Sequence, residues 1–102
     1  MPVDPKVSMT SHAGHVTKKV NKLKKFMDEN QSLTPRTEKQ AEALMKEVTD
    51  TYARMEAKWF EFEDDVQSKN EALHTELTQK LEDSSKLADD IVASMTKMLK
   101  DH

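Results

Sequence analysis

The sequence predicts an all-α protein, in which an antiparallel helical hairpin with a long second helix is followed by a C-terminal helical segment. Composition and spacing both indicate this fold class. The chain has 102 residues with one glycine and three prolines, whereas turns and sheets need more glycine and more β-branched residues. Apolar side chains also recur every three or four positions over most of the chain, which is the period of an amphipathic helix.

The beginning of the chain is expected to lack structure. Residues 1–10 contain Pro2 and Pro5 and few side chains that could pack, so we expect a disordered lead-in. A single helical domain is then expected over residues 11–102, because a chain of this length holds one domain with a limited core.

The first helix is expected over residues 12–30. Its apolar positions lie four, three and four residues apart, and they form the stripe Val16, Val20, Leu23 and Met27. Five lysines lie close together in the same segment: Lys18, Lys19, Lys22, Lys24 and Lys25. The segment therefore predicts a basic amphipathic helix.

The second helix is expected over residues 35–67. The hydroxyl group of Thr34 can cap its start, and Pro35 occupies the first helical position, where a missing N–H costs nothing. The connection from the first helix is short, so the two helices should fold back on each other as an antiparallel pair.

The apolar stripe of the second helix indicates a long contact surface. It advances by four and three residues without interruption through Ala41, Met45, Val48, Tyr52, Met55, Trp59, Phe62 and Val66. This pattern covers about three and a half heptads and is typical of coiled coils. We therefore expect a coiled-coil-like dimer.

A third helix is expected over residues 70–100, where the apolar stripe continues one residue out of frame. Two explanations fit this shift. A straight helix drifts by ~20° per heptad against a seven-residue repeat, or the helix breaks and Ser68 or Asn70 caps a third helix. One unbroken helix over both segments would be roughly 98 Å long at 1.5 Å per residue. We therefore favour a break within residues 67–86.

The aromatic segment KWFEFEDD, residues 58–65, has two interpretations. Trp59 and Phe62 continue the stripe, whereas Phe60 lies about 100° around the helix, at the flank of that stripe. Either all three are core residues, or Phe60 anchors a protein interface together with Tyr52 or Trp59. The residues predicted to mediate protein contacts are Tyr52, Met55, Trp59, Phe60, Phe62, Val66, Ile91, Met95 and Met98.

Charge is distributed unevenly along the chain. Residues 1–25 carry six lysines against one aspartate, whereas residues 61–90 carry ten acidic residues against three lysines. This polarity suits pairing between helices better than nucleic-acid binding, which needs a sustained basic surface. The alternative function is a contact with a membrane surface or nucleic acid through the five lysines of the first helix.

The sequence contains no motif of an enzyme or a cofactor site. It has no glycine-rich phosphate loop, no nucleophile elbow and no cysteine. His12 and His15 lie three residues apart, but no further metal ligand stands near them. We expect a non-enzymatic protein without cofactor or metal, which mediates self-association or assembly as a homodimer or with other helical proteins.

The hydropathy and cysteine content of the chain are used to predict its cellular location. No apolar run approaches the roughly 18 residues that span a bilayer. The absence of cysteine excludes a disulfide framework. We therefore expect an intracellular, cytoplasmic protein.

Three segments together carry a resemblance to a known family. They are the short basic helix with Leu23–Phe26, the polar turn NQSLTP, and the segment RMEAKWFEFEDDVQ, in which Phe62 and a Val-Gln pair follow Trp59. In this layout, the chain from Val16 to Leu81 resembles the N-terminal helical region of Gag-like proteins from Bel/Pao-type LTR retrotransposons. The resemblance implies a self-associating, non-enzymatic module upstream of a capsid-like segment.

Overall fold

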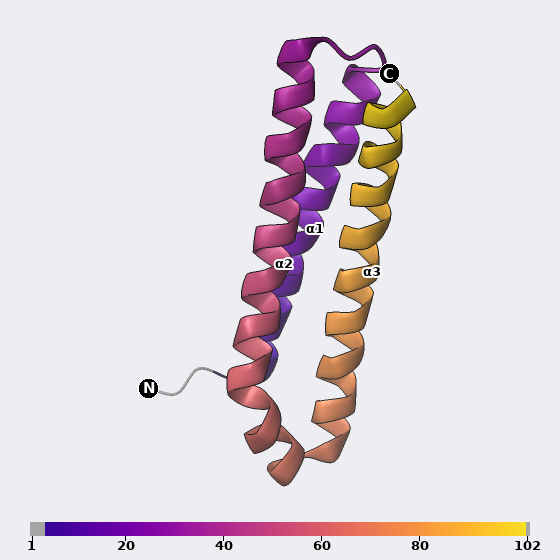
Figure 1. Cartoon of the computed structure of the whole chain (residues 1–102). Coiled ribbons are helices and arrows are strands. Elements are labelled where there is room, and N and C mark those ends of the chain that lie inside the picture. The colour runs from indigo at the N-terminus through magenta and orange to yellow at the C-terminus, as the bar shows by residue number, and fades with distance from the viewer. Residues whose placement is uncertain (1–3, 102) are drawn as a thin grey trace.

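The computed structural model describes residues 4–101, which form a bundle of three helices. The helices are α1 (Pro5–Glu29), α2 (Pro35–Lys69) and α3 (Glu71–Asp101). They lie side by side along a body of 51 × 23 × 17 Å, and α2 runs antiparallel to both α1 and α3 (Figure 1). No strand occurs in the described residues, so the predicted all-α class is confirmed.

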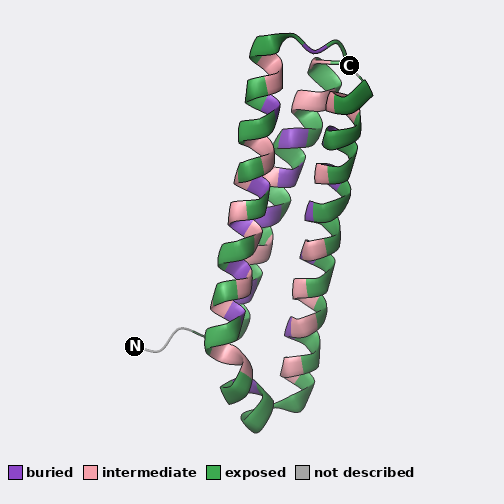
Figure 2. Cartoon of the chain, viewed as in Figure 1, coloured by how far each residue is buried: buried purple, intermediate pink, exposed green. Residues whose placement is uncertain are grey.

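The core is a single column between the three helices. Each helix turns its buried residues inward and its exposed residues outward (Figure 2). The largest side chains that are almost fully buried are Met9, Leu23, Met55, Trp59, Leu77 and Met95. Because every helix supplies part of this column, α3 covers the apolar stripes that a hairpin of α1 and α2 would leave open.

The start of α1 differs from the prediction of a disordered lead-in over residues 1–10. The helix begins at Pro5, and the side chain of Asp4 caps it by accepting a hydrogen bond of 2.9 Å from the Lys6 N–H. Met9 is fully buried and therefore anchors this first part of α1 in the core. Residues 1–3 lie outside the described part of the chain. The Asp-Pro pair is a cap followed by a first-turn proline, the same signal that marks the start of α2.

The connection between α1 and α2 follows the predicted capping by Thr34. The Thr34 hydroxyl accepts a hydrogen bond of 3.2 Å from the Thr37 N–H, and the Thr37 hydroxyl accepts one of 2.7 Å from the Thr34 N–H. Pro35 occupies the first turn. Leu33, immediately before the cap, is buried against the core and so fixes where the chain enters α2.

The break between α2 and α3 lies at Asn70, within the predicted range. The Asn70 N–H donates to the Val66 carbonyl oxygen over 2.8 Å and closes α2. The Asn70 side-chain oxygen accepts from the Leu73 N–H over 3.0 Å and caps α3. One residue in an extended conformation therefore ends one helix and starts the next. Residues 82–86, at the other end of the predicted range, are helical.

Candidate interaction surfaces

The nine residues predicted to mediate protein contacts fall into three environments. Five of them lie in the core, with at most 6% of their surface exposed: Met55, Trp59, Val66, Ile91 and Met95. Tyr52, Phe62 and Met98 are partly buried against that core. Phe60 is 65% exposed. The stripes that the sequence assigned to a dimer seam are therefore covered largely within one chain.

Trp59 forms the most specific contact of the buried group. Its ring packs against the imidazole of His74, with 5.4 Å between the ring centroids. The Nε2 atom of His74 lies 3.4 Å from a carboxylate oxygen of Glu63. The sequence alone does not predict this cluster, because it joins residues on either side of Asn70. Placing the turn at Asn70 would have revealed it, since the antiparallel return brings positions 63 and 74 opposite each other.

Phe60 lies on the outer side of α2 among acidic residues. Helical spacing places Glu56 and Asp64 one turn before and one turn after it, with Glu63 beside them. Asp64 is exposed, and Glu56 and Glu63 are partly exposed. We call these four residues, Glu56, Phe60, Glu63 and Asp64, the Phe60 surface. It combines one large aromatic ring with three carboxylates.

A groove between α2 and α3 extends the acidic side of the molecule toward Tyr52. It encloses about 340 Å³ and is lined by Tyr52, Leu81, Glu82, Ser85, Lys86, Asp89 and Asp90. The Tyr52 hydroxyl donates a hydrogen bond of 3.5 Å to Glu56. Partial burial raises the pKa of Tyr52 above its usual value, and the charges of Glu56 and Asp89 raise it further. Three acidic residues against one lysine make the lining of the groove negatively charged.

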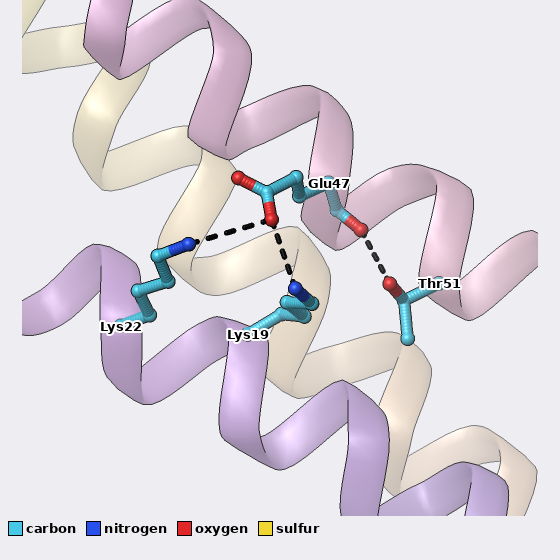
Figure 3. Close-up of polar contacts among 4 residues, drawn as sticks. All are labelled: Lys19, Lys22, Glu47 and Thr51. Carbon is cyan, nitrogen blue, oxygen red and sulfur yellow. Dashed lines mark hydrogen bonds and ion pairs between the residues drawn. The ribbon is translucent and has the colours of Figure 1, made fainter.

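Glu47 of α2 draws two of the six lysines of α1 together. One of its carboxylate oxygens lies 2.9 Å from Lys19 Nζ and 3.5 Å from Lys22 Nζ (Figure 3). The hydrogen bond from Lys19 is the largest cause of the lowered pKa of Glu47, and the charge of Lys22 acts in the same direction. The backbone carbonyl of Glu47 accepts a hydrogen bond of 2.6 Å from the Thr51 hydroxyl.

The other lysines of α1 differ in whether they have an ion-pair partner. Lys6 lies 3.6 Å from Glu76 of α3. Lys25 lies 3.9 Å from Glu29 in a largely exposed pair, whereas Lys18 and Lys24 form no ion pair within residues 4–101. Lys18, Lys22 and Lys25 are four and three residues apart, so they share the outward face of α1. We call these three residues the lysine surface. Each of them is exposed.

The comparisons with known proteins do not assign this chain to a family. No protein-family model, no curated protein and no solved structure matches the chain. None of the helices in residues 4–101 combines the length and the apolar character that crossing a bilayer requires. The function proposed below is therefore based on the Phe60 surface and the lysine surface.

Proposed function

We propose that this protein is a non-enzymatic interaction module that associates with further copies of itself. In this association, the Phe60 surface of one copy contacts the lysine surface of another. The observation that carries the proposal is the exposure of Phe60. The chain has five aromatic residues, all within the described part, and the other four are buried or half-buried. Aromatic residues, phenylalanine among them, are enriched in protein interfaces.

Charge complementarity supports the choice of a second copy as the partner. Pairing two Phe60 surfaces would place carboxylates opposite carboxylates, which is unfavourable. Pairing the Phe60 surface with the lysine surface instead places carboxylates opposite ammonium groups. Lys18 has no ion-pair partner within residues 4–101, whereas Lys22 and Lys25 also lie near Glu47 and Glu29. The same polarity extends over the chain, since residues 61–90 are acidic and residues 1–25 are basic.

This contact allows an open assembly. The two surfaces lie on different helices of one copy, so a copy that offers one surface to a partner can keep the other free for a third copy. A head-to-tail contact between unlike surfaces is heterologous. Further copies can be added through such contacts unless the rotation between neighbouring copies closes a ring. A dimer, as predicted from the sequence, is the first step of this series. A scaffold built in this way agrees with the role that the Gag-like resemblance implies.

The expected affinity is low, because the bundle already buries its own core. Only one large aromatic side chain remains to anchor the contact, and exposed ion pairs contribute about 0–1 kcal/mol each. Association therefore depends on concentration and on the number of copies that are held together. Weak contacts of this kind are typical of assemblies that form when many copies are gathered in one place.

Light scattering over a range of protein concentrations tests the proposal. We expect the average mass to rise above the 11.7 kDa of one chain as the concentration increases, and to fall when salt screens the charges. Phe60→Ala should weaken association by about tenfold or more. Val7→Ala is the matched control, because Val7 is an equally exposed apolar residue on α1, at 63%. A wild-type mass that stays at one chain up to millimolar concentration would contradict the proposal.

The alternative is a membrane-surface or nucleic-acid contact through the lysines of α1. Lys18 and Lys24 favour it, because they have no ion-pair partner within residues 4–101. The engagement of Lys19 and Lys22 with Glu47 weakens it by reducing the free positive charge. Binding to acidic vesicles or to an oligonucleotide that falls steeply with salt, and is retained in Phe60→Ala, would favour this alternative over self-association.

A further inference from the structure

A pocket between α1 and α2 gathers positively charged groups. It adjoins the lysine surface through Glu47, which binds Lys19 of the pocket and Lys22 of that surface. The pocket encloses about 310 Å³ and is lined by His12, His15, Lys19, Thr51 and Arg54. Four of these five side chains carry a positive charge or gain one by binding a proton, and none is acidic. The volume lies at the lower end of the range for small-molecule sites. The pocket therefore has the size of a small ligand and the charge to hold an anion.

The two histidines lie close enough to act on one ligand. Their ring centroids are 6.3 Å apart, and the rings are nearly perpendicular. The Nε2 atom of His15 is 3.5 Å from the Ser11 hydroxyl oxygen. Partial burial lowers the pKa of His12, and the positive charges of His15 and Lys58 lower it further. No carboxylate counteracts this effect on His12.

The acidic side chains beside the pocket are already paired, one of them with the pocket's own Lys19. Glu47 on α2 is bound by Lys19 and Lys22. Glu61 lies 3.5 Å from Lys58. Arg54 has no hydrogen-bond or ion-pair partner within residues 4–101. On the described structure, α3 contributes no residue to the lining. The guanidinium of Arg54 and the imidazole of His12 thus face the pocket without a counter-ion from the protein.

We propose that this pocket binds a phosphate group, either as the free anion or as a phosphomonoester. The guanidinium group of Arg54 offers two parallel N–H donors, which match two oxygens of a phosphate. Protonated His12 and His15 each add a charged N–H donor, and Lys19 adds an ammonium group at the edge nearest Glu47. A phosphate carries about −1.5 to −2 charges at neutral pH, which the pocket can balance once its histidines are protonated.

Binding is coupled to proton uptake. A bound anion favours the charged imidazolium, so it raises the pKa of His12 relative to the empty pocket, where burial and the charges of His15 and Lys58 lower it. Affinity for an anion of constant charge is therefore highest below the lowered pKa of His12 in the empty pocket, and it falls as the pH rises through the higher pKa of His12 in the bound state. Sulfate is such an anion, because it keeps two charges over this range. Phosphate loses charge at low pH. Comparing the pH dependence of sulfate affinity with that of phosphate affinity therefore separates protonation of the protein from protonation of the ligand.

Nuclear magnetic resonance of the histidine side chains tests the site on the whole chain. Inorganic phosphate, sulfate or a soluble phosphomonoester such as glycerol phosphate is titrated at constant ionic strength, with chloride as the balancing anion. We expect saturable shifts of the His12 and His15 ring signals, whereas His74, which faces Glu63, should not respond. Tighter binding of glycerol phosphate than of inorganic phosphate would identify an esterified ligand, and the reverse order a free anion.

The two arginines of the chain provide a matched pair of variants. Arg54→Gln should weaken phosphate binding by about tenfold or more, because it removes the paired donors. Arg36→Gln, at the exposed start of α2, should leave binding unchanged. His12→Gln should reduce the dependence of sulfate affinity on pH and serves as a second variant.

Equal phosphate binding by wild type and Arg54→Gln, or shifts of the histidine signals that chloride reproduces, would overturn the proposal. Phe60→Ala should bind phosphate normally, so this test is independent of self-association.

Discussion

Two neighbouring aromatic residues, Trp59 and Phe60, show how sharply the two sides of α2 differ. Trp59 is 2% exposed and packs against His74, whereas Phe60 is 65% exposed and lies among carboxylates. A rotation of about 100° per residue is sufficient to place one ring inside the bundle and the next ring in water. The comparison teaches that the position of an aromatic residue on the helix, and not its hydrophobicity, separates a core residue from a candidate contact residue.

Replacing each of the two residues by alanine gives the largest expected difference. Trp59→Ala should lower the free energy of unfolding by about 3–5 kcal/mol, because it leaves a cavity in the core. Phe60→Ala should change it by less than about 0.5 kcal/mol. Urea unfolding followed by circular dichroism measures both values at a concentration where the protein is monomeric. Similar losses in the two variants would show that the outer side of α2 is also packed.

Met9 and Val7 extend the comparison to the start of α1. Met9 is fully buried, whereas Val7 is 63% exposed two residues earlier. Met9→Ala should lower the free energy of unfolding by about 2–5 kcal/mol, and Val7→Ala should have an effect below about 0.5 kcal/mol. The same unfolding measurement applies. An unchanged stability of Met9→Ala would mean that α1 does not contribute to the core before residue 10.

Asn70 should have an intermediate effect, because it acts through the backbone and not through packing. Asn70→Ala removes the side-chain oxygen that caps α3 and should cost about 1 kcal/mol. Asn21→Ala is the control, since Asn21 lies on the exposed side of α1 and alanine favours a helix interior. Thermal unfolding of the two variants distinguishes them. A loss as small in Asn70→Ala as in the control would show that the turn keeps its shape without this hydrogen bond.

Glu47 should have the smallest effect, and that effect should depend on pH. Its pKa in the folded state is lowered, chiefly by the hydrogen bond from Lys19. The resulting stabilisation is present above the pKa of an unfolded glutamate, about 4.3, and is lost as the pH falls through the lower folded-state pKa. Because the side chain is 38% exposed, Glu47→Gln should cost less than about 1 kcal/mol at pH 7. The difference from wild type should vanish near pH 2. A constant difference at both pH values would contradict this origin.

Much of the fold follows from local signals in the sequence. The spacing of apolar residues predicts the faces of all three helices, and Thr34 with Pro35 predicts the start of α2 to the residue. The equivalent capping signal at Asp4 and Pro5 lies among few apolar residues, and the prediction therefore starts the first helix too late. Met9 shows why this prediction is wrong, since one buried side chain is sufficient to extend α1 into the core.

The candidate surfaces are harder to predict from the sequence. An apolar stripe shows that a helix face must be covered, but not whether the same chain or a second copy covers it. That depends on the direction in which α3 leaves Asn70, which is a property of the folded backbone. The pocket of His12 and Arg54 is also invisible in the sequence, because it joins residues from two helices. Dimerisation and the Gag-like resemblance stay predictions.

The connection at Asn70 has a consequence for changes in chain length. With a single residue between α2 and α3, an inserted residue has no loop to occupy and must lengthen a helix. Each added helical residue would turn α3 by about 100° and carry Leu77 away from the axis of the bundle. The segment 30–34 can instead take up an insertion by bulging. Length variation in such a protein should therefore accumulate between α1 and α2, while the spacing from Trp59 to His74 stays constant.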